Sequence, residues 1–147
     1  MKASTLAFVS LLLLRTFPAQ AITLEIYGRT LPAVMKGQNA EIDLRESVGA
    51  VTERLLNENQ RKGLLKFEGN SGGIVSINGL RNAVEVVTPT LTRAYGWCFS
   101  VNGLAPDEMP DQSYFHSQQD VLRWFYGYAE FRNGKWISQC VPAVRTP

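Results

Sequence analysis

Cysteine, histidine and charge are all scarce in this 147-residue sequence. Two Cys and one His are too few for a Cys–His metal cluster or for a scaffold held mainly by disulfides. Charged residues make up 19% and hydrophobic residues 45%, with a formal net charge of +2. This balance argues against wholesale disorder and against a polybasic nucleic-acid-binding arm. The length and composition predict one ordinary globular domain.

The N-terminus has the pattern of a secretory signal peptide. Lys2 gives a positive start, and Ala3 to Leu14 is an almost unbroken apolar run. Pro18 and the small residues of Ala19-Gln20-Ala21 then form a typical cleavage site. We predict that residues 1–21 are cleaved and that the mature chain is secreted or periplasmic. The alternative is an uncleaved anchor, but the run is shorter than the roughly 20 residues that span a bilayer, and no later run approaches that length.

Cleavage at this site changes the charge of the protein. Without Lys2 and Arg15, 13 of the 15 basic residues remain against 13 acidic ones. The mature chain is therefore formally neutral, which removes the compositional support for long-range attraction to nucleic acid or to an anionic membrane.

Export also determines how Cys98 and Cys140 are interpreted. In an oxidising compartment the two cysteines can form one intramolecular bridge. It would close a loop of about 43 residues, worth roughly 4 kcal/mol in the loop-entropy model. The alternatives are a redox thiol and an intermolecular bridge. No Cys-x-x-Cys pair is present, so a structural disulfide is favoured.

The hydrophobic pattern predicts an α+β fold. After two early strands, Ser47 is a plausible N-cap of a helix that ends at Gly63. Asn133-Gly134 predicts a C-terminal β-hairpin that pairs Tyr126–Arg132 with Lys135–Cys140. The other predicted strands are Thr23–Tyr27, Ala40–Leu44, Leu64–Phe67, Ile74–Ile77, Trp97–Val101 and Val121–Phe131. We predict a single domain over residues 22–141, followed by a flexible tail at residues 142–147.

Aromatic residues are concentrated in the C-terminal half. In the mature chain, all but Tyr27 and Phe67 lie between Tyr95 and Trp136. In extended segments, Trp97, Phe99 and Val101 would share one face, as would Leu122, Trp124, Tyr126 and Tyr128. Two interpretations follow: these residues are part of the core with cross-strand aromatic pairs, or they form a stacking surface for a flat ligand or a partner.

Three segments carry a family resemblance in their order and spacing: Ile74 to Leu80, Tyr95 to Gly103 with its Val-Asn-Gly ending, and Gln119 to Tyr126 with its Trp-Phe-Tyr ending. They resemble an uncharacterised bacterial domain family that is itself similar to the C-terminal β domain of transcobalamin and intrinsic factor. The resemblance covers roughly Ala40 to Phe131. It implies a β-grasp-like mixed sheet with one packed helix, in agreement with the hydrophobic pattern.

The sequence departs from this family at three places. Gln119 stands where the family usually has Gly, Gly96 separates Tyr95 from Trp97, and the cysteine pair is an addition. In transcobalamin the β domain covers one face of cobalamin beside a large helical domain, of which this sequence has none. The resemblance implies cobalamin or a related corrinoid as a candidate ligand, with no cofactor required.

Catalytic and metal-binding patterns are weak. His116 is the sole histidine, in a predicted loop, and no Gly-x-Ser-x-Gly nucleophile motif occurs. Asp107, Glu108 and Asp111 lack the spacing of a calcium-binding loop, which favours a solvated loop. Gly69 to Gly73 lacks the Lys-Ser or Lys-Thr of a phosphate-binding loop, so a turn explains it better.

We therefore predict a non-enzymatic binding module. In the first hypothesis, Tyr95, Trp97, Trp124 and Tyr126 form an aromatic sheet face that stacks on a small flat ligand such as a corrinoid. The alternative is a protein–protein interaction or assembly module at the cell envelope or surface, using an exposed strand edge or the same aromatic patch. An enzyme of unrecognised type is a distant third option. We expect no nucleic-acid partner and no stable membrane span after cleavage.

Overall fold

The computed structural model describes residues 21–30 and 32–143. The predicted signal peptide lies outside these residues except for Ala21, and the predicted tail lies outside them from residue 144 onward. Pro142, the first residue of that tail, is still part of a strand. The elements in order are β1 (Ile22–Tyr27), β2 (Met35–Ala40), α1 (Val48–Arg61), β3 (Phe67–Asn70), β4 (Gly73–Ile77), β5 (Leu80–Arg81), β6 (Ala83–Thr88), β7 (Leu91–Val101), β8 (Val121–Arg132) and β9 (Lys135–Pro142).

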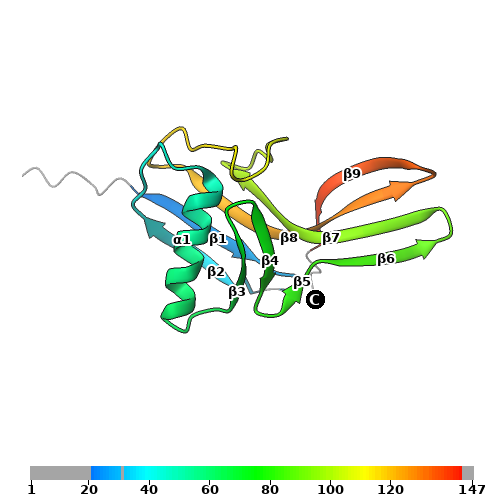
Figure 1. Cartoon of the computed structure of the whole chain (residues 1–147), viewed down its shortest axis with the longest axis horizontal. Coiled ribbons are helices and arrows are strands. Elements are labelled where there is room, and N and C mark those ends of the chain that lie inside the picture. Colours follow the sequence, from blue (N-terminus) through cyan, green and yellow to red (C-terminus); the bar gives the residue numbers. More distant parts are fainter. Residues whose placement is uncertain (1–20, 31, 144–147) are drawn as a thin grey trace, which may run out of the picture.

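Six strands form the main sheet, in the order β2-β1-β8-β7-β6 with β9 also beside β8 (Figure 1). β1 runs parallel to β8, and the other neighbours are antiparallel. The long strand β8 pairs with β1 over Val121–Phe125 and with β9 from Gly127 onward. β3, β4 and β5 form a second, smaller sheet. The predicted α+β class, with a mixed sheet, one packed helix and a C-terminal hairpin, is confirmed.

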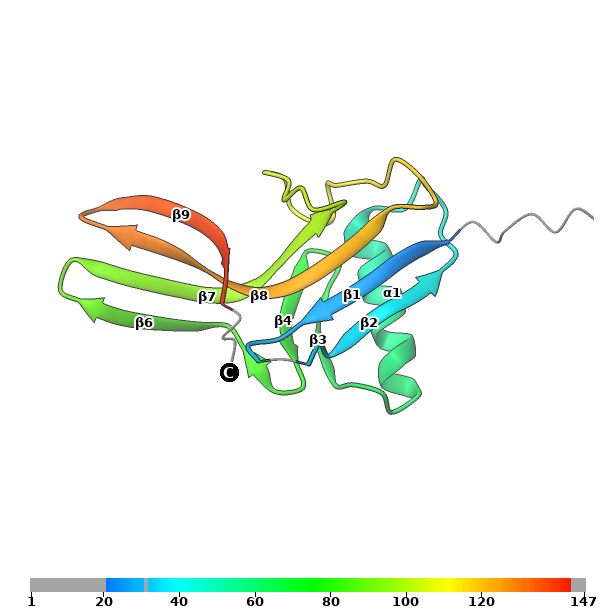
Figure 2. The same ribbon diagram turned by 180° about the vertical axis from the view of Figure 1, so that it is seen from behind.

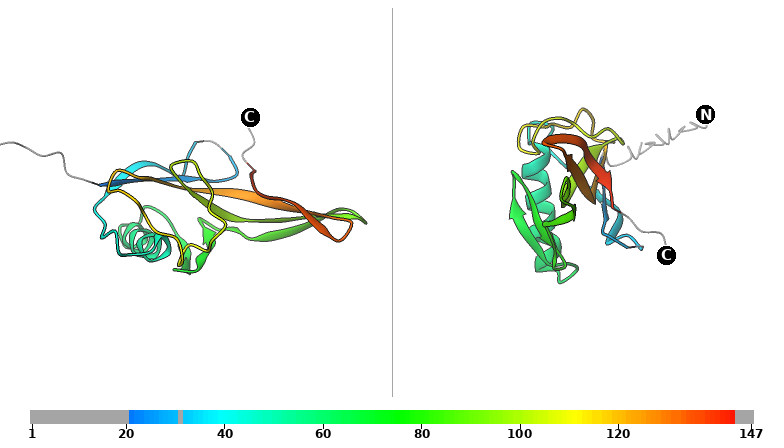
Figure 3. Two further views of the ribbon diagram at one scale, coloured as in Figure 1. Left: turned by 90° about the horizontal axis from the view of Figure 1, so that it is seen from above. Right: turned by 90° about the vertical axis from the view of Figure 1, so that its right-hand side faces the viewer.

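The helix and the small sheet lie against one face of the main sheet (Figure 3). Alternation along β1 directs Ile22, Leu24 and Ile26 toward this face, and each is 0% exposed. The helix contributes Val48, Val51, Leu55 and Leu56 to the same core. Full burial of each such side chain contributes about 1.5–3 kcal/mol relative to exposure. The core therefore lies between α1 and the half of the sheet that contains β1.

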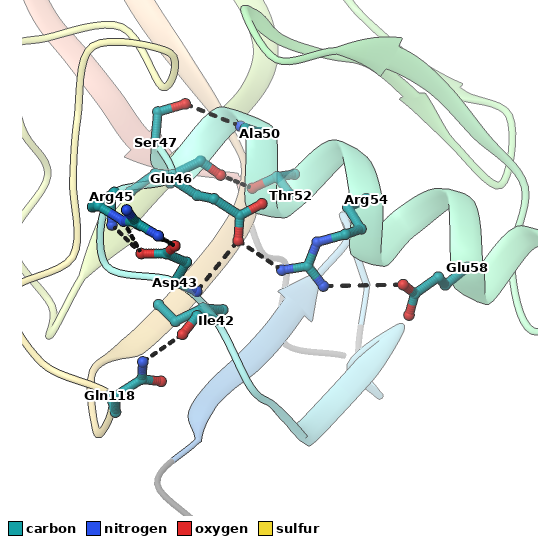
Figure 4. Close-up of polar contacts among 11 residues, drawn as sticks. Ile42, Asp43, Arg45, Glu46, Ser47, Ala50, Thr52, Arg54, Glu58 and Gln118 are labelled. Atoms are coloured by element: carbon teal, nitrogen blue, oxygen red, sulfur yellow. Dashed lines mark hydrogen bonds and ion pairs between the residues drawn. The ribbon is translucent and has the colours of Figure 1, made fainter.

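The helix α1 begins and ends where the sequence predicts. Ser47 has extended backbone angles (φ −69°, ψ 158°), and its Oγ accepts the N–H of Ala50 at 3.2 Å (Figure 4). Gly63 adopts a φ of +71° just after the last turn. Of the described residues, no helix is long and apolar enough to cross a membrane.

The first turn of α1 contacts two other segments closely. The N–H groups of Val48 and Gly49 donate to the carbonyls of Ser113 and Pro110, at 2.8 and 2.7 Å. These bonds satisfy donors that have no partner within the helix. A Cβ on Gly49 would lie 1.8 Å from the carbonyl oxygen of Ser71, in the β3–β4 turn. Glycine is therefore required here by the close approach of two backbones.

The other half of the main sheet extends beyond the helix as an arm (Figure 2). We define the arm as residues 83–95 and 127–142, which belong to β6, β7, β8 and β9. β6 is exposed along its whole length, and Val84, Val86 and Trp136 are 73%, 72% and 56% exposed. No helix or second sheet of the described chain packs on the arm. Its apolar side chains therefore remain open to solvent.

The predicted disulfide between Cys98 and Cys140 is present. Cys98 belongs to β7 and Cys140 to β9, and these strands flank β8, so the bridge passes over Gly127. A Cβ on Gly127 would lie 3.3 Å from the Cys98 Sγ and 2.9 Å from the carbonyl oxygen of Val141. The missing side chain leaves space for the bridge, which holds the arm to the core end of the sheet.

The strand predicted at Ala40–Leu44 is wrong, because the observed strand is Met35–Ala40. The Asp43 carboxylate accepts the N–H of Arg45 at 2.9 Å, and the Asp43 carbonyl accepts the N–H of Glu46 at 2.9 Å. These turn contacts lead the chain into the helix instead of along the sheet.

The strand predicted at Leu64–Phe67 is also displaced, since β3 begins at Phe67. The N–H of Leu64 donates to the carbonyl of Asn59 at 3.0 Å, which keeps Leu64 in the turn that ends the helix. The prediction also missed β6 and the first half of β7. Both lie in the arm, where strands form without a core to signal them through burial.

Candidate functional site

Two of the four aromatic residues predicted to face a ligand lie in the core. Trp124 and Tyr126 are each 1% exposed. The Trp124 Nε1 donates to the Thr52 Oγ1 at 3.0 Å, and that hydroxyl donates to the carbonyl of Val48 at 2.7 Å. The Tyr126 hydroxyl donates to the carbonyl of Arg81 at 2.7 Å, and burial raises the pKa of Tyr126. Both rings are thus almost fully covered by protein, although Trp124 also lines the groove described below. The stacking surface stays a prediction.

Tyr95 and Trp97 remain partly exposed on the same face of β7. The Trp97 Nε1 donates to the carbonyl of Leu80 at 3.0 Å, which attaches the β4–β5 hairpin to the main sheet. The Tyr95 hydroxyl donates to Glu85 at 2.7 Å, and the Arg29 guanidinium lies 5.0 Å from the Tyr95 ring centre. Among the four residues predicted to face a ligand, Tyr95 and Trp97 are the two that are partly exposed, and both lie beside an open space.

That space is an open groove of about 980 Å³ where the arm meets the core. Gly96–Phe99 of β7 lies along it. Its walls are Gly73–Val75 of β4, the loop Ala105–Pro110, and Asn82–Val84 at the start of β6. Trp136 and Cys140 line it from the arm. Most of these residues are apolar, and the volume lies within the range of ligand-binding pockets.

The groove contains a free strand edge. β6 pairs with β7 only over Leu91–Tyr95, so no strand among the described residues is hydrogen-bonded to the outer edge of β7 at Gly96–Ser100. Val101 directs its N–H and carbonyl away from β8, toward Leu104, at 3.0 Å each. Since these directions alternate along an antiparallel strand, the N–H and carbonyl groups of Trp97 and Phe99 also point away from β8. No strand of the described chain pairs with these four groups.

The loop that forms one wall of the groove is acidic. Among the described residues that line the groove, Asp107 and Glu108 are the charged ones, and both are exposed. The neighbouring Asp111 is exposed but lies outside the lining. Among residues 21–30 and 32–143, no group of three or more His, Cys, Asp and Glu side chains is placed to hold a metal ion. The groove therefore combines an apolar strand edge with negative charge at one wall.

Asp120 fixes the far end of the same loop. Its carboxylate accepts the Asn102 side-chain N–H at 2.9 Å and the backbone N–H groups of His116 and Ser117 at 2.8 and 3.1 Å. Burial alone would raise the pKa of Asp120, but these hydrogen bonds outweigh it and lower the pKa. His116 thus takes part through its backbone, and its side chain is exposed.

The glycine-rich segment Gly69–Gly73 forms the turn between β3 and β4. The Asn70 side chain accepts the N–H of Gly72 at 2.8 Å, as in an Asx turn. The expected turn is therefore present, and Gly72 and Gly73 also line the groove.

Sequence reasoning found Tyr95 and Trp97 but missed the groove itself. Its walls come from three segments that are far apart in the chain, and no local pattern joins Val75, Pro106 and Trp136. The alternation of Val84, Glu85 and Val86 was a usable signal for β6. That signal predicts a strand, but it does not give the register of β6 against β7, which leaves Gly96 outside the pairing.

Comparison with known proteins gives no assignment: no family model, no curated protein and no solved structure matches this chain.

Proposed function

We propose that the protein is an exported, non-enzymatic binding module and that the groove beside β7 is its binding site. One observation carries this proposal: an open, apolar groove of about 980 Å³ lies along a sheet strand whose outward backbone groups pair with no strand of the described chain. Burial of such groups without hydrogen-bond partners costs free energy. A ligand that pairs with them and also covers the apolar lining avoids this cost and buries apolar surface as well.

The exposed arm supports a protein as the partner. Val84, Trp136 and Ile137 are 73%, 56% and 57% exposed, and they lie on strands that extend past the core. Of these, Val84 and Trp136 also line the groove. A partner seated in the groove could therefore continue over the arm and bury these side chains. The protein–protein alternative predicted from the sequence is favoured on this basis.

A small flat ligand is the second candidate. The groove volume suits a molecule of cofactor size, and Tyr95 and Trp97 lie on its lining. The transcobalamin-like resemblance makes a corrinoid the chemical class to test. Trp124 lines the groove but, like Tyr126, is only 1% exposed, so stacking would rest mainly on Tyr95 and Trp97.

The test is to purify the mature chain from its native host and to identify what co-purifies by absorption spectroscopy and mass spectrometry. Val75 is 45% exposed on the groove lining, so Val75→Lys should remove the co-purifying species. Val86 is 72% exposed and outside the groove, so Val86→Lys should retain it as the matched control. Retention of the species by Val75→Lys, or its loss from both variants, contradicts the groove as the site.

A further inference from the structure

We infer that the groove binds an extended peptide segment, apolar along its length and carrying Lys or Arg at one end, which adds a strand to the free edge of β7. This inference rests on the proposed function and names the partner class of the same site. Three features support it: the free edge of β7, the apolar lining of the groove and the negative charge of the loop that forms one wall.

The edge offers the hydrogen-bonding pattern of a missing strand. Trp97 and Phe99 present two N–H donors and two carbonyl acceptors that no strand of the described chain pairs. An antiparallel or parallel strand satisfies such groups with its own backbone, as in strand-addition complexes. The free stretch Gly96–Ser100 is long enough for about five residues of a partner, or roughly 17 Å.

The edge also lacks the usual features that prevent strand addition. Exposed sheet edges are normally protected by charged side chains, proline or bulges. Gly96–Ser100 contains no charged residue and no proline, and its pairing with β8 is regular throughout. The outer strands of the main sheet carry such features: β2 has Lys36 and an irregular register with β1, β6 has Glu85 and an irregular register with β7, and β9 has Pro142. Among the described edges of the main sheet, Gly96–Ser100 of β7 therefore lacks these protecting features.

The lining determines the side chains of the partner. Successive residues of an added strand point to opposite faces of the sheet. Along β7, alternation directs Trp97 and Phe99 to one face and Ala94 and Cys98 to the other, and all four residues line the groove. Because both sides are apolar, both sets of partner side chains are expected to be apolar or small.

The negative charge of the loop determines which charge the bound segment is expected to carry. Asp107 and Glu108 are negative, and no Lys or Arg is among the described residues that line the groove. Arg29 and Arg93 each lie 5.0 Å from the ring centre of a lining tyrosine, Tyr95 and Tyr128 respectively. Complementary charge at this wall is therefore Lys or Arg at one end of the bound segment. Because both carboxylates are exposed, salt should weaken this contribution while leaving the apolar part intact.

The test selects binders from a displayed library of random 12-residue peptides on the mature chain with its disulfide intact. We expect selected peptides to have apolar or small residues at successive positions and to carry Lys or Arg at one end. Their Kd should rise about tenfold or more on Val75→Lys and less than about twofold on Val86→Lys. Asp107→Asn with Glu108→Gln should weaken binding several-fold at low salt, whereas Asp111→Asn should not.

Three outcomes overturn the inference. Selected peptides that bind Val75→Lys as tightly as the parent protein place the site elsewhere. If no peptide is enriched while a small molecule co-purifies and is lost on Val75→Lys, the proposed groove stands but its peptide partner does not. If the chain instead self-associates and Val75→Lys makes it monomeric, the occupant is a second copy.

Discussion

The buried hydrogen bond between Trp124 and Thr52 gives the sharpest test of how the aromatic residues are used. Both side chains are 1% exposed, and the indole N–H has the Thr52 hydroxyl as its acceptor at 3.0 Å. Thr52→Val removes that acceptor while leaving the shape of the side chain nearly unchanged. If Trp124 were a ligand-stacking residue near the surface, water would replace the lost partner at little cost.

The expected loss follows from this burial. A buried donor left without a partner costs about 1–3 kcal/mol, so Thr52→Val should lower the free energy of unfolding by that amount. Trp124→Phe removes the donor and part of the ring, at a cost of roughly 2–4 kcal/mol, somewhat below that of truncation to Ala. In the Trp124→Phe background the Thr52→Val change leaves no orphaned N–H. The two losses should therefore be less than additive, by about 1–2 kcal/mol.

Urea unfolding of the four proteins in this cycle, with the disulfide intact, measures the coupling. A coupling free energy near zero would refute the buried hydrogen bond. So would a Thr52→Val loss below about 0.5 kcal/mol, the size typical of surface changes.

Three further predictions concern stability. Gly49→Ala should destabilise the protein by more than about 3 kcal/mol, because its Cβ would overlap the carbonyl of Ser71 at 1.8 Å, and urea unfolding measures this loss. Replacement of Cys98 and Cys140 together by Ala should cost up to roughly 4 kcal/mol in the same measurement, because the unfolded chain gains entropy. Since hydrogen bonds lower the pKa of Asp120 in the folded state, its contribution is full above the unfolded pKa of about 3.9 and is lost as pH falls through the lower folded value. Acid titration of stability should therefore be less steep in Asp120→Asn.

Matched controls isolate each effect. Gly28→Ala places its Cβ at 3.5 Å or more from other atoms and should be nearly neutral, so an equal loss at both glycines would contradict the close approach at Gly49. Reduction of the parent protein should reproduce the double cysteine variant. An acid titration of stability that is unchanged in Asp120→Asn would refute the role of that carboxylate.

Much of the fold follows from local signals in the sequence. Ser47 and Gly63 marked the helix ends because capping depends on nearby residues alone. Asn133 adopts a φ of +50° at the predicted hairpin turn, where Asn-Gly is favoured for the same local reason. Trp97 and Phe99 were predicted to lie on the same face because side chains alternate along a strand.

Long-range properties could not be predicted in the same way. Alternation placed Trp124 on a face, but its burial depends on the helix packing over that face, and the acceptor Thr52 lies 72 residues away. The groove depends on where β6 stops relative to β7, which is a matter of register between strands. Sequence pattern therefore identified the aromatic residues, and tertiary packing divided them between core and groove.

Residue-resolved hydrogen exchange of β7 tests the central claim most directly. In the free protein, the amides of Trp97 and Phe99 should exchange fast, while those of Cys98 and Ser100, paired with β8, should be protected. On addition of a selected peptide, Trp97 and Phe99 should become protected as well. Slow exchange of Trp97 and Phe99 in the free protein, or no change on binding, would contradict a free strand edge that serves as the binding site.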